Sequence, residues 1–382
     1  MTLLEPLRTA LQRCVVNANK LMDMPDFPYA TKDGKWQTIS PADAGFMPAH
    51  GSWTVGFTPG LLWLAYRLTD DRRYVDAALE RCERFVHRKH DSTTHDIGFV
   101  FTPSFIEGYK LTGKDWLREA AVEAATTLAS RYNPQGRFLR AWGPLGSQER
   151  AGETTIDAMM NLELLYWAAS ELERSDLATI ATSHAETSAR FLLRPDGSTY
   201  HAYAFDPLTG LPLRGFTHQG LRDDSTWSRG QAWAIYGFAN AARWTGREDF
   251  AAASSRCAEY FRARLPEHGV PPWDFDSADQ DLHDSSASAI AAAGLLVLAS
   301  VHPDNDRAER YRSAAIQLLV ALTDRCSTSN RQDHEGLLTS GIWHLTAGFA
   351  VDEALIYGDY YYMQALTRLH EPEPALTHRG HR

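Results

Sequence analysis

One short stretch, residues 223–236 with the sequence DDSTWSRGQAWAIY, gathers carboxyl, hydroxyl, indole, amide and guanidinium groups. If a helix begins near Ser228, Arg229 and Trp233 lie four residues apart and project from one face. A guanidinium can bind a carboxylate through two hydrogen bonds, an indole can cover the apolar face of a sugar ring, and Gln231 could add amide hydrogen bonds. These groups suit a uronic acid. The alternative is a buried amphipathic helix in which Arg229 pairs with a neighbouring aspartate, and chemistry alone leaves both interpretations open.

Two aspartates stand in surroundings that could alter their acidity. Asp157 lies in TTIDAMMNL, an apolar stretch near a predicted helix start, so we expect burial to raise the pKa of its carboxyl, as a general acid requires. Asp96 lies in HDIGFVF, where Gly98 would let a ligand come close. The alternative for either residue is a helix N-cap, which is a common place for aspartate.

Other motifs narrow the possible chemistry. His201 lies in GSTYHAYAFD, and His218 and Gln219 lie in THQG, where they could donate hydrogen bonds to sugar hydroxyls. Histidines on loops are more often surface residues, and the chain has no HExxH motif, so we expect no metal and no other cofactor. The sequence also lacks a GxSxG elbow, a Walker loop and a GxGxxG loop after a strand. Because these motifs are absent, acid–base catalysis by carboxylates is the class of chemistry that remains.

The elements that must position these residues are mostly helices. A polar turn followed by an aromatic residue or Leu and then Ala recurs at residues 69–78, 112–121 and 245–254, with a looser copy at 304–315. Each copy joins two segments with apolar residues at helical spacing, which predicts helical hairpins. The predicted helices span residues 3–22, 58–69, 71–88, 98–111, 114–131, 154–172, 175–193, 228–244, 247–264, 284–300, 306–326 and 349–369.

Tandem hairpins can form an open solenoid or close into a ring of inner and outer helices. Strand signals are sparse, for example at residues 199–205, so the protein is predicted to be essentially all-α. Long connections rich in Gly and Trp favour the closed ring, an (α/α)6 barrel, because such loops at one rim would build an active-site cleft. These connections are residues 27–57, 132–153, 195–227, 266–283 and 330–348. No composition shift marks a linker, so we expect residues 1–382 to form one catalytic domain.

Composition sets limits on partners and compartment. Hydrophobic residues make up 44% and charged residues 23% of the chain, as in soluble globular proteins. The net charge of −10, without a basic block, argues against nucleic acid and membrane partners. The four cysteines are far apart and form no CxxC pair, and the N-terminus lacks the pattern of a secretory signal. We therefore expect a cytoplasmic protein, as a monomer or a homodimer.

Five segments, in order along nearly the whole chain, resemble the unsaturated glucuronyl hydrolases of glycoside hydrolase family 88. They are residues 95–99 (HDIGF), 156–162 (IDAMMNL), 224–237 (DSTWSRGQAWAIYG), 284–292 (DSSASAIAA) and 357–362 (YGDYYY). The resemblance implies an (α/α)6 barrel that removes the 4,5-unsaturated uronic acid left by polysaccharide lyases at the non-reducing end of oligosaccharides. An aspartate protonates C4 of the vinyl ether while water adds at C5, and the resulting hemiketal rearranges. Carboxylate spacing therefore predicts no stereochemical outcome here.

The resemblance also implies roles for individual residues. Asp157 would be the general acid and then the base that handles water, and Asp96 would be the second catalytic carboxylate. Sugar contacts would come from His201, Gln219, Arg229 and Trp233, with Trp53 and Trp142 as weaker candidates for pocket walls. A helix cap and inner-barrel packing explain the segments at 284–292 and 357–362 without chemistry.

Substrate choice and rival functions remain open. Residues 340–352 contain neither Lys nor Arg, so strongly sulfated substrates are disfavoured, although Arg222 or another loop could supply a basic group. The nearest rival is the sister family that acts on unsaturated galacturonyl-rhamnose. A sugar epimerase on the same barrel would need facing histidines, which the paired aspartate motifs fit poorly. A non-catalytic helical scaffold would leave Asp157 without a purpose in its apolar stretch.

Overall fold

The computed structural model of the protein describes residues 4–40, 53–331 and 333–371. Its α-helices are α1 (Glu5–Met22), α2 (Phe57–Thr69), α3 (Arg72–Phe85), α4 (Ile97–Phe101), α5 (Glu107–Thr112), α6 (Asp115–Ala129), α7 (Ala158–Leu172), α8 (Ser175–Phe191), α9 (Ser228–Thr245), α10 (Glu248–Ala263), α11 (Ser285–Val301), α12 (Asn305–Arg325) and α13 (Ile356–His370). A 3-10 helix, η2 (Val86–His90), follows α3, and a π-helix, η3 (Thr102–Ile106), joins α4 to α5.

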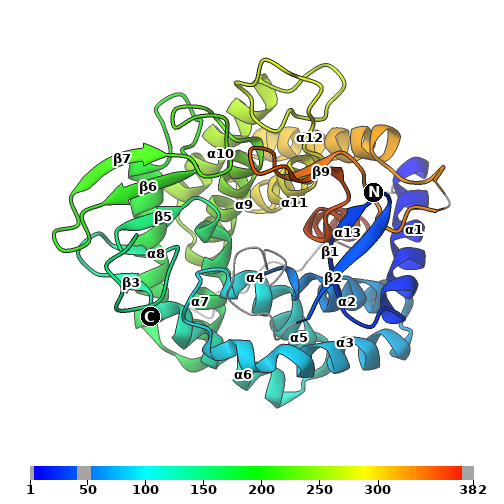
Figure 1. Cartoon of the computed structure of the whole chain (residues 1–382), viewed down its shortest axis with the longest axis horizontal. Helices are drawn as coiled ribbons and strands as arrows, with labels where there is room; N and C mark the ends of the chain where they lie inside the picture. Colours follow the sequence, from blue (N-terminus) through cyan, green and yellow to red (C-terminus); the bar gives the residue numbers. More distant parts are fainter. Residues whose placement is uncertain (1–3, 41–52, 332, 372–382) are drawn as a thin grey trace.

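The inner helices contact one another in a closed cycle. The order is α2, then the continuous segment α4–η3–α5, then α7, α9, α11 and α13, which returns to α2 (Figure 1). Most positions of α2, α4, α7, α9, α11 and α13 are buried; α9 is buried throughout residues 228–242 and α11 throughout residues 285–298. The exception is α5, in which only Gly108 is buried. The predicted closed (α/α)6 ring is therefore confirmed.

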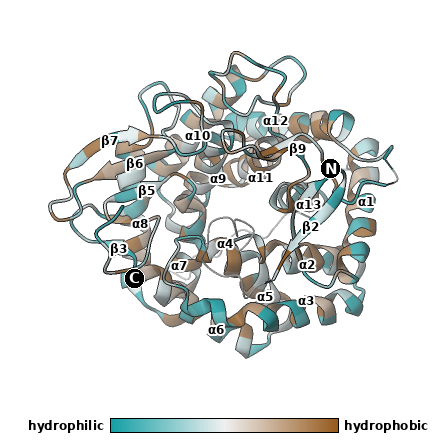
Figure 2. Ribbon diagram, viewed as in Figure 1, coloured by the Kyte–Doolittle hydropathy of each residue, from teal (hydrophilic) through white to brown (hydrophobic). Residues whose placement is uncertain are grey.

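The outer helices are α1, α3, α6, α8, α10 and α12, and they bury one face each. In α3, for example, Tyr74, Val75, Ala78, Cys82 and Phe85 are buried at helical spacing. This amphipathic pattern produces the alternation of apolar and polar colour along the outer helices in Figure 2. Apart from α5, the inner helices are buried over most of their length because other helices and loops surround them.

Close packing within the inner ring depends on small residues. A Cβ atom at Gly237 in α9 would lie 2.4 Å from the Cβ of Met159 in α7. A Cβ atom at Gly294 in α11 would lie 2.8 Å from backbone and Cβ atoms of Tyr236 in α9. Both distances are shorter than real Cβ contacts, so glycine allows these helices to approach.

The recurring turn has a common structure. At its three clear copies the residue after the threonine ends the helix in the left-handed conformation. The threonine hydroxyl donates to the carbonyl four residues earlier and accepts from the N–H two residues later. The copies are Thr69-Asp70, Thr112-Gly113 and Thr245-Gly246. The repeat is thus a helix stop, as the predicted hairpins required.

Short strands lie between the helices. They are β1 (Phe27–Lys32), β2 (Lys35–Ile39), β3 (Tyr132–Asn133), β4 (Phe138–Leu139), β5 (Glu153–Thr155), β6 (Ala202–Phe205), β7 (Pro212–Phe216), β8 (Gly341–His344) and β9 (Phe349–Glu353). All pairs are antiparallel: β1 with β2, β3 with β4, β6 with both β5 and β7, and β8 with β9. The strand signal at residues 199–205 corresponds to β6.

Two predicted helix starts are wrong because strand pairing takes their first residues. The helix predicted from residue 154 begins at Ala158, since β5 pairs with β6. The helix predicted from residue 349 begins at Ile356, since β9 pairs with β8. The helix predicted over 98–111 is interrupted by η3, where Pro103 lacks an N–H and cannot continue regular α-helical hydrogen bonding.

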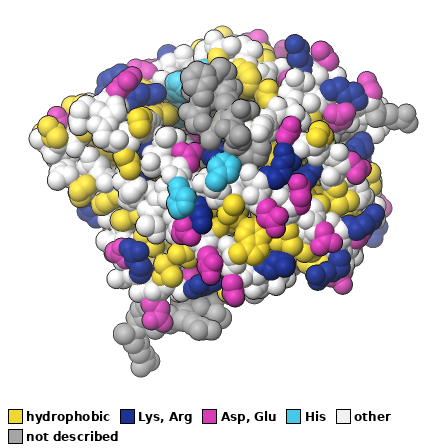
Figure 3. Space-filling view, turned by 60° about the horizontal axis from the view of Figure 1, so that its bottom comes forward, with side chains coloured by type: hydrophobic (Ala, Val, Ile, Leu, Met, Phe, Trp, Pro, Cys, Tyr) yellow, Lys and Arg dark blue, Asp and Glu magenta, His cyan; other side chains and the backbone are white. Residues whose placement is uncertain are grey.

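The surface and the cysteines agree with the composition. Acidic and basic side chains are interspersed over the coloured part of the face in Figure 3, where histidine side chains gather near the centre. Cys14, Cys82, Cys257 and Cys326 are unpaired by disulfides and buried. In the part of the chain described, no helix combines the length and apolar character needed to cross a bilayer.

Candidate active site

A cavity of about 480 Å3 opens between the inner ring and the rim loops. The eight residues to which the family resemblance assigned roles all line it, and so does His218; the eight are Trp53, Asp96, Trp142, Asp157, His201, Gln219, Arg229 and Trp233. Its volume is within the range of small-ligand pockets. Asp96 and Asp157 immediately precede α4 and α7, and Arg229 is the second residue of α9. N-terminal ends of inner helices therefore point their positive dipole ends towards this space.

Aromatic rings form much of the wall. The ring centre of Trp53 lies 5.1 Å from Phe99 and 5.5 Å from Trp343, and Phe99 lies 5.1 Å from Trp233. Nearer the mouth, the guanidinium carbon of Arg150 lies 3.7 Å from the ring centre of Trp142. Flat apolar surfaces of this kind can stack on sugar rings.

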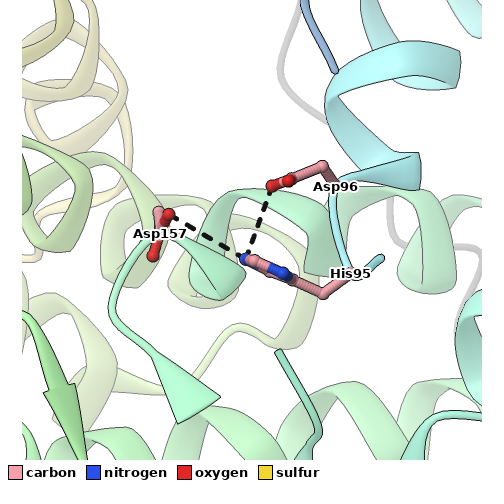
Figure 4. A group of neighbouring side chains, drawn as sticks. All are labelled: His95, Asp96 and Asp157. Carbon is pink, nitrogen blue, oxygen red and sulfur yellow. Dashed lines mark ion pairs between the residues drawn. The ribbon is translucent and has the colours of Figure 1, made fainter. Parts of the chain in front are cut away.

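Asp96 and Asp157 are joined by a histidine that the sequence analysis did not single out as a site residue. Figure 4 shows the ring of His95 between the two carboxyl groups. Its Nε2 atom lies 3.4 Å from an oxygen of Asp96 and 3.9 Å from an oxygen of Asp157. Thr155 Oγ1 lies 3.1 Å from the same nitrogen, and Nδ1 lies 2.9 Å from the carbonyl oxygen of Ala141. Because a carbonyl only accepts, Nδ1 carries a proton and donates it to Ala141.

The two carboxyl groups have pKa values shifted in opposite directions, and the shift at Asp157 is opposite to the one we expected. Burial acts to raise the pKa of Asp157, but the hydrogen bond and positive charge of His95 outweigh it and hold this pKa well below its ordinary value. Burial raises the pKa of Asp96, which the charge of His95 only partly opposes. The expected rise in the pKa of Asp157 is therefore wrong for the ligand-free protein, because local sequence does not show that the ring of His95 lies beside this carboxyl.

The two carboxyls also differ in their hydrogen bonds. Asp96 accepts from Thr94 Oγ1 at 3.0 Å. Asp157 Oδ1 is buried and has no hydrogen-bond partner among the residues that the structure describes. Neither side chain makes an N-cap hydrogen bond, so the simple capping role does not account for them. A buried, unpaired acceptor on a cavity wall is a place where a ligand or water can bind.

His201 is held as a neutral hydrogen-bond donor. Its Nδ1 atom accepts from the backbone N–H of His218 at 3.1 Å and of Gln219 at 3.2 Å. Nδ1 is therefore unprotonated, and Nε2 carries the proton of the neutral ring. Burial lowers the pKa of His201 to about 3, which keeps the ring neutral near neutral pH.

Arg229 and Gln219 line the cavity, but protein partners also hold them. Arg229 forms a buried ion pair with Asp284 at 2.6 Å and donates to the carbonyls of Ile342 and Trp343. Gln219 Nε2 donates to the Trp343 carbonyl at 3.0 Å. Arg229 thus anchors β8 to α9 of the inner ring, and Gln219 joins β8 to the loop that follows β7. The interpretation of Arg229 as the partner of a neighbouring aspartate is confirmed, and Asp284 also caps α11 by accepting from Ser286 N.

Gln231 differs from its expected place. Its amide is fully buried and bonds to Gly197, Cys257 and Thr199 outside the cavity lining. The expectation that it contacts a ligand is wrong, because position 231 lies on another face of α9 from Arg229 and Trp233.

Other cavity residues escaped sequence reasoning as site residues. Trp227 lies 4.5 Å from the ring of His201, and Trp343 and His344 come from the β8 strand. The indole of Trp227 was visible within the 223–236 segment, whereas nothing in the sequence linked residues 343 and 344 to that segment. The ligating atoms of His95, Asp96 and Asp157 lie within 4.8 Å of one another, close enough for a metal ion. Ion pairing of the histidine with the two carboxyl groups explains the same arrangement.

Comparison with known proteins identifies relatives across almost the entire chain. The family model described as Glycosyl Hydrolase Family 88 matches residues 27–364. An unsaturated glucuronyl hydrolase from Bacillus sp. strain GL1 is 40% identical over 327 residues, which cover 83% of this chain and 86% of that protein.

Solved structures agree. The crystal structure of unsaturated glucuronyl hydrolase from Bacillus sp. GL1, described as responsible for the degradation of glycosaminoglycan, matches with a TM-score of 0.89 at 36% identity. The match covers 96% of this chain and 97% of that one. A variant of the Streptococcus agalactiae unsaturated glucuronyl hydrolase complexed with dGlcA-GalNAc6S matches with a TM-score of 0.80 at 30% identity, covering 98% and 94% of the two chains.

Proposed function

This chain belongs to glycoside hydrolase family 88, and from that premise we propose that Asp157 and Asp96 hydrate the double bond of an unsaturated uronic acid in the cavity. The enzyme is an unsaturated glucuronyl hydrolase, which releases the unsaturated sugar from the non-reducing end of oligosaccharides. The assignment of roles rests on one observation above all. Two aspartates at inner-helix N-termini share one histidine in an aromatic cavity, and one of them has an unpaired buried oxygen.

The proposed reaction balances without a cofactor. The carboxylic acid of Asp157 donates its proton to C4 of the C4=C5 vinyl ether, which places positive charge on C5 and the ring oxygen. Water bonds to C5 and gives a proton to the Asp157 carboxylate, so this residue is acid and then base. The C5 hemiketal then opens: the bond between C5 and the ring oxygen breaks, C5 becomes a ketone, and C1 expels the aglycone as an alcohol.

Asp157 must gain a proton before it can donate one. In the ligand-free protein its pKa is depressed, so the carboxylate form dominates. A bound uronic acid adds a negative charge and displaces water, and both changes raise the pKa of nearby carboxyls. Asp96, whose pKa is already raised, supports this step by staying protonated more readily than an ordinary aspartate and by limiting the negative charge in the site.

We assign recognition of the acidic sugar to side chains that have an N–H group available for a hydrogen bond or an aromatic ring available for stacking. His201 offers Nε2–H, while Trp53, Trp142 and Trp233 offer ring surfaces. The N-terminal ends of α7 and α9 favour a bound carboxylate. The guanidinium of Arg229 is already bonded to Asp284 and to β8. We therefore assign it a role in supplying positive charge and in positioning Trp343, more than in donating hydrogen bonds to the sugar.

The aglycone subsite is assigned to the rim formed by residues 142–150 and the β8–β9 hairpin. This hairpin carries no Lys or Arg between 340 and 352, so we propose a preference for aglycones without sulfate. Arg222, the alternative basic residue, is 53% exposed and pairs with Asp224. Arg150 lines the cavity instead and is the basic side chain best placed to meet an anionic aglycone.

Unsaturated disaccharides prepared from several polysaccharides test this function. Each is mixed with the enzyme while the ultraviolet absorbance of the ring double bond is followed. We expect absorbance to fall with unsaturated glucuronyl disaccharides, faster for unsulfated than for sulfated ones. Turnover confined to unsaturated galacturonyl-rhamnose would instead assign the chain to the sister activity. Cytoplasmic location and the monomeric or dimeric state stay predictions, which cell fractionation and light scattering can check.

A further inference from the structure

We propose that His95 is the proton store of the catalytic pair: its Nε2–H, shared between Asp96 and Asp157, is delivered to Asp157 when the unsaturated sugar fills the cavity. This inference rests on the proposed function and adds to it the origin of the proton. His95 is a positioning residue in this scheme, because it acts on the substrate only through Asp157.

The geometry fixes the direction in which His95 can give a proton. Nδ1–H is committed to the Ala141 carbonyl at 2.9 Å, and the side chain is only 3% exposed. The second proton of the charged ring therefore sits on Nε2, which faces Asp96 at 3.4 Å, Asp157 at 3.9 Å and Thr155 Oγ1 at 3.1 Å (Figure 4). Within the described part of the chain, the three groups that Nε2 faces all belong to the catalytic site.

Thr155 offers a path that bridges the longer distance. Its hydroxyl can accept from Nε2–H and donate to Asp157, and a hydrogen bond from Thr155 contributes to the lowered pKa of that carboxyl. Thr155 is the last residue of β5, two residues before Asp157, so strand pairing with β6 holds the hydroxyl in place. Catalytic hydrogen bonds are commonly long in ligand-free structures and shorten when the substrate binds.

Charges from four sides bear on the ring. Asp96 before α4 and Asp157 before α7 favour the imidazolium, whereas Arg131 before β3 opposes it. His184 in α8 is buried and neutral, since burial lowers its pKa to about 3. Burial alone would lower the pKa of His95, but the two carboxylates raise it above its ordinary value. The two carboxyl groups therefore favour the charged form of the ring in the ligand-free site.

Filling the cavity reverses the balance. In the ligand-free site an imidazolium and a carboxylate are stabilised by water and by each other. When the sugar excludes water, the neutral pair of imidazole and carboxylic acid is favoured because charged groups lose more on desolvation. The N–H bond of His95 breaks and the O–H bond of Asp157 forms. After turnover the water-derived proton on Asp157 returns to His95, so each cycle restores the starting state.

The pH dependence of turnover in His95→Gln tests the proposal. Glutamine keeps a polar side chain of similar reach but cannot carry the second proton. We expect kcat to fall by roughly 100-fold or more, the size of a general-acid contribution, with KM changed only a few-fold. The alkaline limb of the kcat/KM profile should move down by about one pH unit or more, because Asp157 must then hold its own proton as a carboxyl. Full kcat, or a loss of kcat with an unmoved alkaline limb, overturns the proposal.

Two matched variants at residue 155 test the proposal even if the substitution at position 95 disturbs folding. Thr155→Ser keeps the hydroxyl, and Thr155→Val keeps the shape without it. We expect Val to reduce kcat about tenfold more than Ser, with similar melting temperatures. Equal kcat for the two variants contradicts the relay. Wild-type loss of double-bond absorbance is measured alongside: if wild type is inactive on every unsaturated disaccharide, the proposed function itself fails, whatever the variants show.

Discussion

Asp157 is the residue on which the chemistry depends. Asp157→Asn keeps shape and most polar contacts but removes the titratable proton, so we expect turnover to fall by roughly 1,000-fold or more while the disaccharide still binds. Single-turnover assays and calorimetric binding measure the two effects. Asp96→Asn is the comparison variant: a smaller loss there supports the assisting role, whereas a larger loss than in Asp157→Asn would exchange the two roles.

Arg229 is predicted to matter for stability as much as for recognition. Arg229→Ala leaves the buried carboxylate of Asp284 unpaired, which should cost about 3–5 kcal/mol of unfolding free energy. Chemical denaturation checks this value. The double variant Arg229→Ala with Asp284→Ala should lose less than the sum of the single losses, because it removes both charges. If the unfolding free energy is unchanged and KM rises, Arg229 acts in ligand binding and not in stability.

At the scale of single residues, the sequence predicted which residues form the site better than it predicted their protonation. The family resemblance was enough to predict that Asp96, Asp157, His201 and Trp233 share one site, and all four line the cavity. The acidity of Asp157 was not predictable, because it depends on His95, whose ring is fixed by the Ala141 carbonyl and Thr155. The orientation of the His95 ring depends on hydrogen bonds to segments that are distant in sequence, so it cannot be predicted from the local sequence.

The rim segments decide which aglycone the enzyme accepts. Arg150 stacks on Trp142 and pairs with Glu153 at 2.7 Å, with its side chain 34% exposed. We predict that Arg150→Gln lowers the ratio of kcat/KM for sulfated over unsulfated disaccharides roughly fivefold, as a partly exposed charge contact of about 1 kcal/mol would. Arg222→Gln is the matched control, since Arg222 is exposed, pairs with Asp224 and lies outside the cavity lining. Equal ratios in both variants would remove Arg150 from the subsite.

Helix α13 carries a buried carboxyl that makes stability depend on pH. Asp359 accepts from the N–H groups of Leu337 and Leu338 ahead of β8, and burial raises its pKa to about 7. Because this folded-state pKa lies above the unfolded value of 3.8, Asp359 contributes less stability as pH rises through about 7. Asparagine loses one acceptor at every pH but does not ionise. The destabilisation by Asp359→Asn should therefore be larger near pH 5 than near pH 8 in thermal melts, and equal losses would contradict the raised pKa.

Element boundaries show where sequence patterns stop being informative. The helical hairpins were predictable because the Thr69, Thr112 and Thr245 turns recur with the same helix-ending chemistry. The starts of α7 and α13 were misplaced because β5 and β9 depend on partners that are distant or separated by a turn. Strands of three to five residues carry too few side chains to reveal their period.

The whole molecule explains how a chain of net charge −10 binds an acidic sugar. Closing six inner segments into a ring brings helix N-termini to one cavity, where local dipoles outweigh the distant surface charge. The ring was predictable from tandem hairpins with long connections. The meeting of Gln219 and Arg229 with Trp343 was not, because ring closure brings together residues more than a hundred positions apart in sequence.

Hydration of the double bond, with the proton entering at C4, is the central claim, and proton NMR of the reaction in D2O tests it most directly. An unsaturated glucuronyl disaccharide is followed at once by NMR and by the ultraviolet absorbance of its double bond. We predict that wild type places one deuterium at C4, in a single configuration and in step with the fall in absorbance, and that Asp157→Asn does neither. Release of the aglycone with the double bond still intact in the sugar product would contradict the account.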